Sequence, residues 1–177
     1  HKRIMADREV CCLLSGGLDS SIVASIVSKY IKDNYGTKVK TFSIGMTGSP
    51  DLKYAQMVAN HIDSEHYNIE IKEDDFLNSI EETIKVIESY DITTVRASVG
   101  NYLVSKFIKN NTDCVVVFNG DYSDEVMGGY IYMNLCNDEN EFNRETCRLV
   151  NDICYFDSLR SDRSISNNGL EARVPFG

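Results

Sequence analysis

Several features that would place this chain in other classes of protein are missing from its sequence. No apolar run approaches the ~20 residues that cross a bilayer, and residues 1–7 lack the apolar stretch of a signal peptide. There is no C-x-x-C pair and no His at zinc-ligand spacing, so the six cysteines are expected to be reduced. Lys and Arg are scattered and the net charge is −9, which argues against nucleic acid or a membrane as a partner. We therefore expect a soluble, cytoplasmic protein.

The 177 residues also contain no internal repeat, low-complexity tract or Pro/Gly/Ser-rich linker, so one domain is expected. Apolar runs typical of buried strands occupy 10–14, 39–44, 66–71 and 114–118. Helical patterns alternate with them, with inward faces predicted along Ile22–Ile31, Leu52–Ile62, Phe76–Ile87 and Val95–Phe107, and a further helix over 139–160. This alternation predicts an α/β fold, a three-layer sandwich around a mostly parallel sheet.

The most informative stretch follows the first predicted strand and opens the first helix. It reads Ser15-Gly16-Gly17-Leu18-Asp19-Ser20. A Gly-Gly turn leading into a helix N-terminus presents free backbone N–H groups and the positive end of the helix dipole, which suits an anion. Neither the three spaced glycines of dinucleotide-binding proteins nor a Gly-Lys-Ser/Thr phosphate loop is present. A glycine turn capped by serines, without a ligand, is the alternative.

A second polar loop, Asn119 to Glu125, follows the fourth predicted strand. Ligands of such folds bind at the carboxyl ends of the strands, where the strand order reverses. If the first and fourth strands are neighbours there, the two loops face each other across one crevice. Both loops carry acidic residues, so a triphosphate would need magnesium between Asp19 and Asp124.

The first loop resembles the PP-loop of the ATP pyrophosphatases, enzymes that split ATP into AMP and pyrophosphate. Four further motifs extend the resemblance to nearly the whole chain. They are Gly48-Ser-Pro-Asp51, Tyr90-Asp-Ile-Thr-Thr-Val-Arg96, Asn119-Gly-Asp-Tyr-Ser-Asp-Glu125 with Gly128-Gly-Tyr130, and Gly169-Leu-Glu-Ala-Arg-Val-Pro-Phe176. In this order and spacing they resemble the synthetase domain of glutamine-dependent asparagine synthetases.

That resemblance implies an ATP-dependent ligase that adenylates the side-chain carboxylate of aspartate and passes it to ammonia to make asparagine. It also implies site residues. The adenine would be contacted by the main chain of Leu14 and Ile44, and the ribose and α-phosphate by Asn119 and Gly120. Pyrophosphate would be bound by Ser15, Gly16, Gly17, Asp19 and Ser20, and Mg²⁺ by Asp19 and Asp124. The aspartate substrate would be held by Thr94 and Arg96. An Arg fork suits a carboxylate. The alternatives are a helix N-cap for Thr94 and an exposed helix charge for Arg96.

The chain departs from the family pattern at Asp121-Tyr122, where the family usually has Glu-Gly. The resemblance assigns that carboxylate, here Asp121, to the proton transferred as ammonia attacks. Aspartate is one methylene shorter, and a misplacement of about 1 Å can cost ~10²-fold in rate. Tyr122 also adds a side chain where the family has glycine, and a positive φ there would strain a residue with a Cβ.

Two parts of the family plan are missing from this sequence: the N-terminal glutaminase domain and the segment beyond Gly177. We expect a single synthetase domain over 1–177 that is part of a longer protein, a truncated relative being the alternative. Three alternatives to the function remain: a β-lactam-forming or other carboxylate-adenylating relative, a catalytically impaired ATP-binding module, and a purely structural role. The nitrogen donor and the oligomeric state are left open, a homodimer being one possibility.

Overall fold

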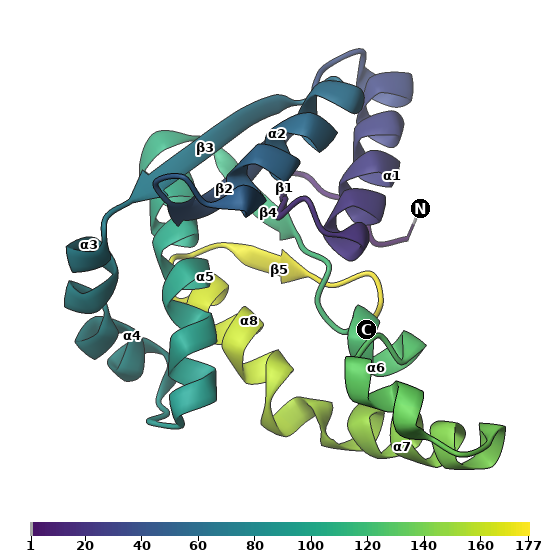
Figure 1. Cartoon of the computed structure of the whole chain (residues 1–177). Helices are drawn as coiled ribbons and strands as arrows, with labels where there is room; N and C mark the ends of the chain where they lie inside the picture. The colour runs from purple at the N-terminus through teal and green to yellow at the C-terminus, as the bar shows by residue number, and fades with distance from the viewer. Residues whose placement is uncertain (1) are drawn as a thin grey trace.

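A computed structural model describes residues 2–177 of the chain. Helices and strands alternate along the first two thirds of the chain, and mostly helices follow (Figure 1). In chain order the elements are β1 (Glu9–Leu13), α1 (Leu18–Tyr35), β2 (Lys40–Met46), α2 (Pro50–His61), β3 (Glu65–Ile71), α3 (Glu73–Asn78), α4 (Ile80–Ile87), α5 (Ile92–Asn111), β4 (Cys114–Phe118), α6 (Ser123–Met127), η1 (Ile131–Leu135), α7 (Glu139–Asp152), η2 (Ile153–Tyr155), α8 (Asp157–Ser166) and β5 (Glu171–Arg173).

The strands form one parallel sheet in the order β3-β2-β1-β4-β5. The chain leaves β1 toward β2 and β3 on one side and returns to β4 on the other side, so the strand order reverses between β1 and β4. Cys11 pairs with Val117 and Cys12 with Phe118, which brings the carboxyl ends of these two strands together. The predicted α/β fold with its parallel sheet is confirmed, and so is the predicted adjacency of the first and fourth strands.

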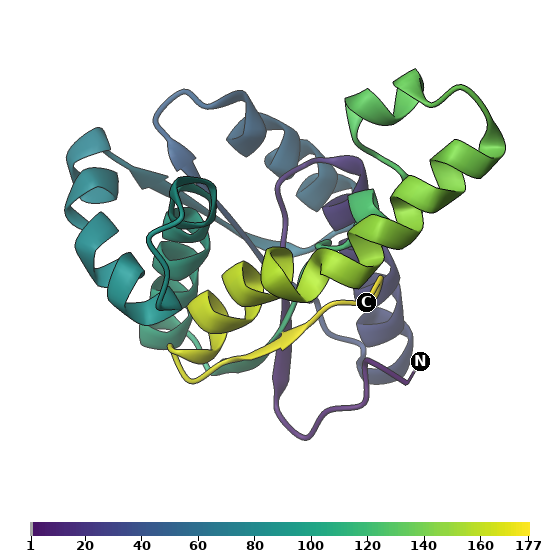
Figure 2. The same cartoon turned by 90° about the horizontal axis from the view of Figure 1, so that it is seen from below.

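Helices cover both faces of the sheet, which makes the three layers seen in Figures 1 and 2. On one face α1 and α2 pack on side chains such as Cys12, Leu14 and Phe118. On the other face α5 and α8 pack on Cys11 and Phe42. The central strands β1 and β4 are therefore apolar on both sides, as parallel strands under two helix layers must be.

Some predicted helix faces are wrong in detail. In α1 the side chains of Ile22 and Ile26 are exposed, because the helix turns the small Ala24 and Ser28 toward the sheet with Val23 and Val27. Small residues there let the helix approach its neighbours closely. Leu77, another predicted inward residue, is also exposed, where the predicted helix breaks into α3 and α4. The helix predicted over 139–160 is divided into α7, η2 and α8, and Phe156, between η2 and α8, is exposed.

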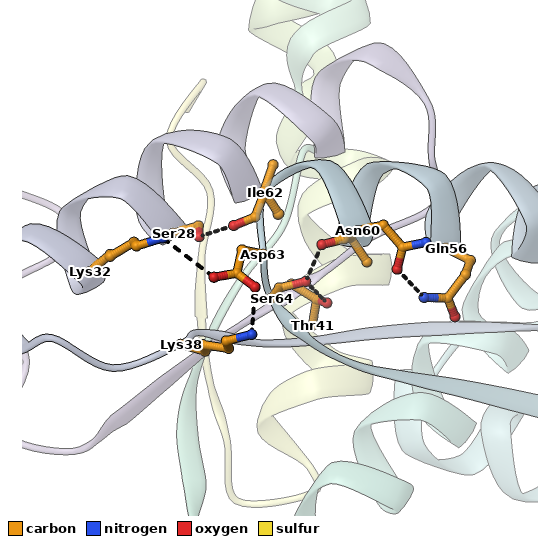
Figure 3. A network of polar contacts seen from close by, with 10 residues as sticks. Ser28, Lys32, Lys38, Thr41, Gln56, Asn60, Ile62, Asp63 and Ser64 are labelled. Carbon is orange, nitrogen blue, oxygen red and sulfur yellow. Dashed lines mark hydrogen bonds and ion pairs between the residues drawn. The ribbon is translucent and has the colours of Figure 1, made fainter.

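A polar network fixes α1, α2 and the start of β3 on β2 (Figure 3). The Ser28 hydroxyl donates to the Ile62 carbonyl at 2.9 Å, and Lys32 and Lys38 pair with Asp63 in the turn before β3. Next to it, the Thr41 hydroxyl lies 2.9 Å from that of Ser64. These contacts set the position of the sheet edge relative to the helices above it.

The two ends of the described chain are tied to each other beside the sheet. Arg173 in β5 donates to the carbonyls of Arg3 and Met5, each at 2.7 Å. In both views the α6 to α7 segment extends away from the sheet beyond the carboxyl ends of the strands (Figures 1 and 2). Across residues 2–177, none of the helices has the length and apolar character of a membrane span.

Candidate functional site

The loop after β1 is held in place by its own hydroxyl groups. The hydroxyls of Ser15 and Ser20 lie 2.9 Å apart, and the Ser21 hydroxyl donates to the Gly17 carbonyl at 2.6 Å. The N-cap of α1 is Gly17, which has no side chain with which to cap the helix. Because the serines satisfy one another, the N–H groups of the first helical turn face the crevice with the helix dipole behind them.

Glycines bring the backbone of this loop against its neighbours. Gly16 has φ +82°, and a Cβ there would lie 2.5 Å from the Ala55 nitrogen in α2. A Cβ on Gly120, in the loop after β4, would lie 2.7 Å from the Ser20 nitrogen and 2.9 Å from the Asp19 carbonyl carbon. The two loops therefore touch through their backbones, and glycine is required at the contact.

The loop after β4 is fixed from three sides. Asn119 donates from its backbone to the Arg173 carbonyl at 3.1 Å, and its side-chain amide donates to Ser161 at 2.6 Å and to Asp121 at 2.9 Å. The Ser123 hydroxyl donates to the Asp19 carboxylate at 2.7 Å and so links this loop to the first. These bonds fix the polar groups before any ligand arrives.

A pocket of about 270 Å³ lies between the two loops. It gathers eight of the predicted site residues, namely Ser15, Gly17, Asp19, Ser20, Asn119, Gly120, Asp121 and Asp124. Five predicted residues are not part of its lining: Leu14, Gly16, Ile44, Thr94 and Arg96. Leu14 is buried, and its backbone nitrogen donates to the Phe42 carbonyl at 2.8 Å.

The pocket also contains side chains that the sequence patterns did not point to as site residues. They are Leu13, Asn101, Tyr122, Ser123, Glu125, Tyr130 and Arg160. Arg160 lies on α8, 35 residues beyond the end of the loop at Glu125, so nothing local in the sequence joins it to Asp121. Glu125 and Tyr130 lie inside one of the motifs named above, and that position was the available sequence signal for them. In the structure the Tyr130 hydroxyl donates to the Glu125 carboxylate.

Burial and like charges act on the carboxylates of the pocket. Burial raises the pKa of Asp121, while Ser161 and the Arg160 charge oppose the rise. Burial also raises the pKa of Asp124, and the nearby negative charges of Asp19 and Glu125 add to it. The negative charges of these acids therefore repel one another in the pocket.

The fit to a metal ion can be tested on the donor set. Within residues 2–177, no three His, Cys, Asp or Glu side chains converge as a ready-made metal site. Asp19 and Asp124 nevertheless offer carboxylate oxygens across the crevice, with Asp124 destabilised as an anion. Mg²⁺ typically takes one or two protein carboxylates together with waters and substrate phosphates, so this pair fits that ion.

The residues predicted to hold aspartate lie at the start of α5. Asp91 is the N-cap of this helix, and both the backbone nitrogen and the hydroxyl of Thr94 donate to it, at 2.8 and 2.7 Å. The alternative that Thr94 is itself the N-cap is therefore wrong, although Thr94 does serve the cap. Arg96 is exposed on the helix surface, and its role stays a prediction.

Comparison with known proteins shows the family to which this chain belongs. A sequence model of the asparagine synthase family matches residues 1–137. The human and chicken asparagine synthetases (glutamine-hydrolyzing) are each 49% identical over 99% of this chain, which spans 31% and 32% of their lengths. The solved structure of a predicted tRNA methyltransferase subunit from Methanocaldococcus jannaschii has the same fold, with a TM-score of 0.50 at 16% identity over 96% of this chain and 69% of that one. The chain belongs to the asparagine synthase family.

Proposed function

We propose that this domain is the ATP-dependent, amide-forming half of an asparagine synthetase. It would transfer AMP from ATP to the side-chain carboxylate of aspartate and then let ammonia displace AMP. The observation that supports this most strongly is the backbone contact between the two loops at Gly120 and Ser20, which makes one anion site at the point where the strand order reverses. The chain spans about a third of its curated relatives, so the activity of the whole protein is part of the proposal.

The first half-reaction requires the triphosphate to be held while a carboxylate oxygen attacks the α-phosphorus. The first turn of α1 and the hydroxyls of Ser15 and Ser20 would bind the leaving pyrophosphate. Asp19 and Asp124 would hold Mg²⁺, which neutralises the charge that develops on the departing oxygens. Asn119 and Gly120 would lie beside the ribose and the α-phosphate. Thr94 and Arg96 stay our candidates for the aspartate.

The second half-reaction requires a base, because the attacking ammonia must lose a proton as the carbon–nitrogen bond forms and AMP departs. Asp121 lines the pocket, and its raised pKa makes its carboxylate a stronger base than an exposed aspartate. Arg160 opposes the negative charge around it. The family membership does not favour the alternative of a non-catalytic module.

The proposal is tested by exchange of labelled pyrophosphate into ATP, which reports the first half-reaction alone. We expect exchange with aspartate and none with glutamate. Asp121→Asn should keep the exchange and lose ammonia-dependent asparagine formation by ~10²-fold or more. Asp152→Asn, on the exposed surface of α7, is the matched control and should change neither rate. Exchange that is absent with aspartate but present with another carboxylate would assign a different substrate.

A further inference from the structure

Tyr122 has a backbone conformation that its side chain disfavours. It lies in the left-handed region, with φ +74° and ψ −2°, between Asp121 and the first residue of α6. A residue with a Cβ is strained there relative to the right-handed region. Such a conformation persists only where the surroundings hold it, so the contacts of the tyrosine ring and hydroxyl are informative.

Two contacts hold the side chain. The Tyr122 hydroxyl donates to the hydroxyl of Ser158 on α8 at 2.6 Å. The ring lies against the backbone of Gly177, with no room for a Cβ between them. The Tyr122 side chain, which disfavours this turn, is thus held by α8 at Ser158 and by the chain at Gly177.

The same helix holds the rest of the loop. Ser161, one turn after Ser158, accepts from the side-chain amide of Asn119, and that amide also donates to Asp121. Arg160 lines the pocket from the same helix. Helix α8 therefore fixes the loop on both sides of Asp121, at Asn119 through Ser161 and at Tyr122 through Ser158.

Because the side chain of Asp121 is short, the attachment of the loop to α8 decides where its carboxylate lies. Its carboxylate has only two rotatable bonds between it and the backbone, so the backbone of residues 119–122 largely decides where it lies. A shift of about 1 Å in a reacting group can cost ~10²-fold in rate.

We propose that Tyr122 is a positioning residue, which through Ser158 holds Asp121 at the place where the proton of ammonia is taken up. This inference rests on the proposed function. It concerns the second half-reaction, because the Tyr122 hydroxyl bonds to Ser158 and not to the first loop, and this bond lies beside Asp121.

The test compares Tyr122→Phe and Ser158→Ala, singly and together, in both half-reactions. Each single change should lower ammonia-dependent asparagine formation about tenfold, as expected for one lost hydrogen bond in a site, and leave pyrophosphate exchange within about twofold. The double variant should lose no more than either single one, because the two changes break the same bond. Tyr132→Phe is the matched control, since it removes a tyrosine hydroxyl bond to Glu145 outside the pocket and should change neither rate.

Tyr122→Gly separates positioning from simple relief of strain. Glycine adopts this conformation freely but cannot reach Ser158, so we expect the variant to fold and to lose asparagine formation at least as far as Tyr122→Phe. Full asparagine formation in Tyr122→Gly would overturn the proposal. Equal losses in both half-reactions, or additive losses in the double variant, would overturn it too.

Hydrogen–deuterium exchange of the 119–122 backbone gives a readout that needs no activity. Tyr122→Phe and Ser158→Ala should speed this exchange several-fold, and Tyr132→Phe should not. If the parent protein made no asparagine, the proposed function would fail while this measurement still tested the attachment. Unchanged hydrogen–deuterium exchange of residues 119–122 in both variants would show that Ser158 does not hold the loop.

Discussion

Gly120→Ala tests the contact on which the whole site depends. The added Cβ would lie 2.7 Å from the Ser20 nitrogen, about 0.7 Å inside an ordinary 3.4 Å contact, and 2.9 Å from the Asp19 carbonyl carbon. Both neighbours are backbone atoms at the start of α1, so no side chain can swing aside. One of the two loops must move.

The size of the effect follows from that overlap. Forcing a methyl group into a well-packed contact costs about 1–3 kcal/mol, which for a domain of this length lowers the melting midpoint by roughly 2–12 °C. Moving the loops apart by most of an ångström should also lower pyrophosphate exchange by about 10- to 100-fold, since reacting groups tolerate such shifts poorly.

The assay is aspartate-dependent pyrophosphate exchange at saturating ATP, together with a thermal melt. Gly100→Ala is the matched control, because a Cβ there meets only the Ile44 side chain at 3.9 Å. It lies inside α5, where alanine is favoured over glycine by about 1 kcal/mol, so its midpoint should stay the same or rise. A Gly120→Ala protein that melts and exchanges like the parent would show that the two loops are not in backbone contact.

Two further predictions concern charge. In Asp124→Asn we expect exchange to fall by ~10²-fold or more through loss of a metal ligand, while the ligand-free protein becomes more stable at neutral pH. The reason is that burial, together with the charges of Asp19 and Glu125, raises the pKa of Asp124 above its unfolded value, so its ionisation costs stability as the pH rises through that range; a less stable variant would contradict this. Burial lowers the pKa of His66 below 6.5, because the charged imidazole is disfavoured in the folded state. The contribution of the neutral His66 to the free energy of unfolding is therefore complete above pH 6.5. It is lost as the pH falls, by less than about 1.4 kcal/mol per pH unit. Urea midpoints at pH 7.5 and 5.5 should show a smaller difference in His66→Asn than in the parent or in His61→Asn, and an unchanged difference would refute the role of His66.

The fold could be predicted from sequence where a pattern is local. Strands of five to seven residues with apolar or alternating character were found at β1 to β4. A Ser-Pro pair is typical of a helix start, and Ser49-Pro50 begins α2, with the Ser49 hydroxyl accepting from the Asp51 nitrogen. β5 was missed because it has three residues, two of them charged, and becomes a strand only by pairing with β4.

The helix faces show what a sequence pattern leaves undecided. Large apolar residues such as Ile22 and Ile26 were predicted to be buried, but α1 packs through Ala24 and Ser28, and Ser28 finds a partner in the Ile62 carbonyl. Which face of α1 is buried depends on how closely α2 approaches, and that is a property of the assembled fold. Hydrophobic periodicity alone therefore does not predict the buried face.

In the site, too, local motifs could be predicted from the sequence and long-range contacts could not. The loops after β1 and β4 could be predicted because each has its own motif and because parallel strands end at one edge. Arg160 could not, because it reaches the pocket from α8. Tyr122 was expected to strain the loop, and its φ of +74° confirms the conformation; its hydrogen bond to Ser158 could be seen only in the structure.

The fate of an oxygen atom tests the central claim most directly. When aspartate labelled with ¹⁸O in its side-chain carboxylate is converted with ATP and ammonia, adenylation predicts one ¹⁸O atom in the AMP formed and none in the pyrophosphate. That result requires a bond between the carboxylate oxygen and the α-phosphorus within the pocket between the two loops. AMP without label, or label in pyrophosphate or orthophosphate, would contradict the account.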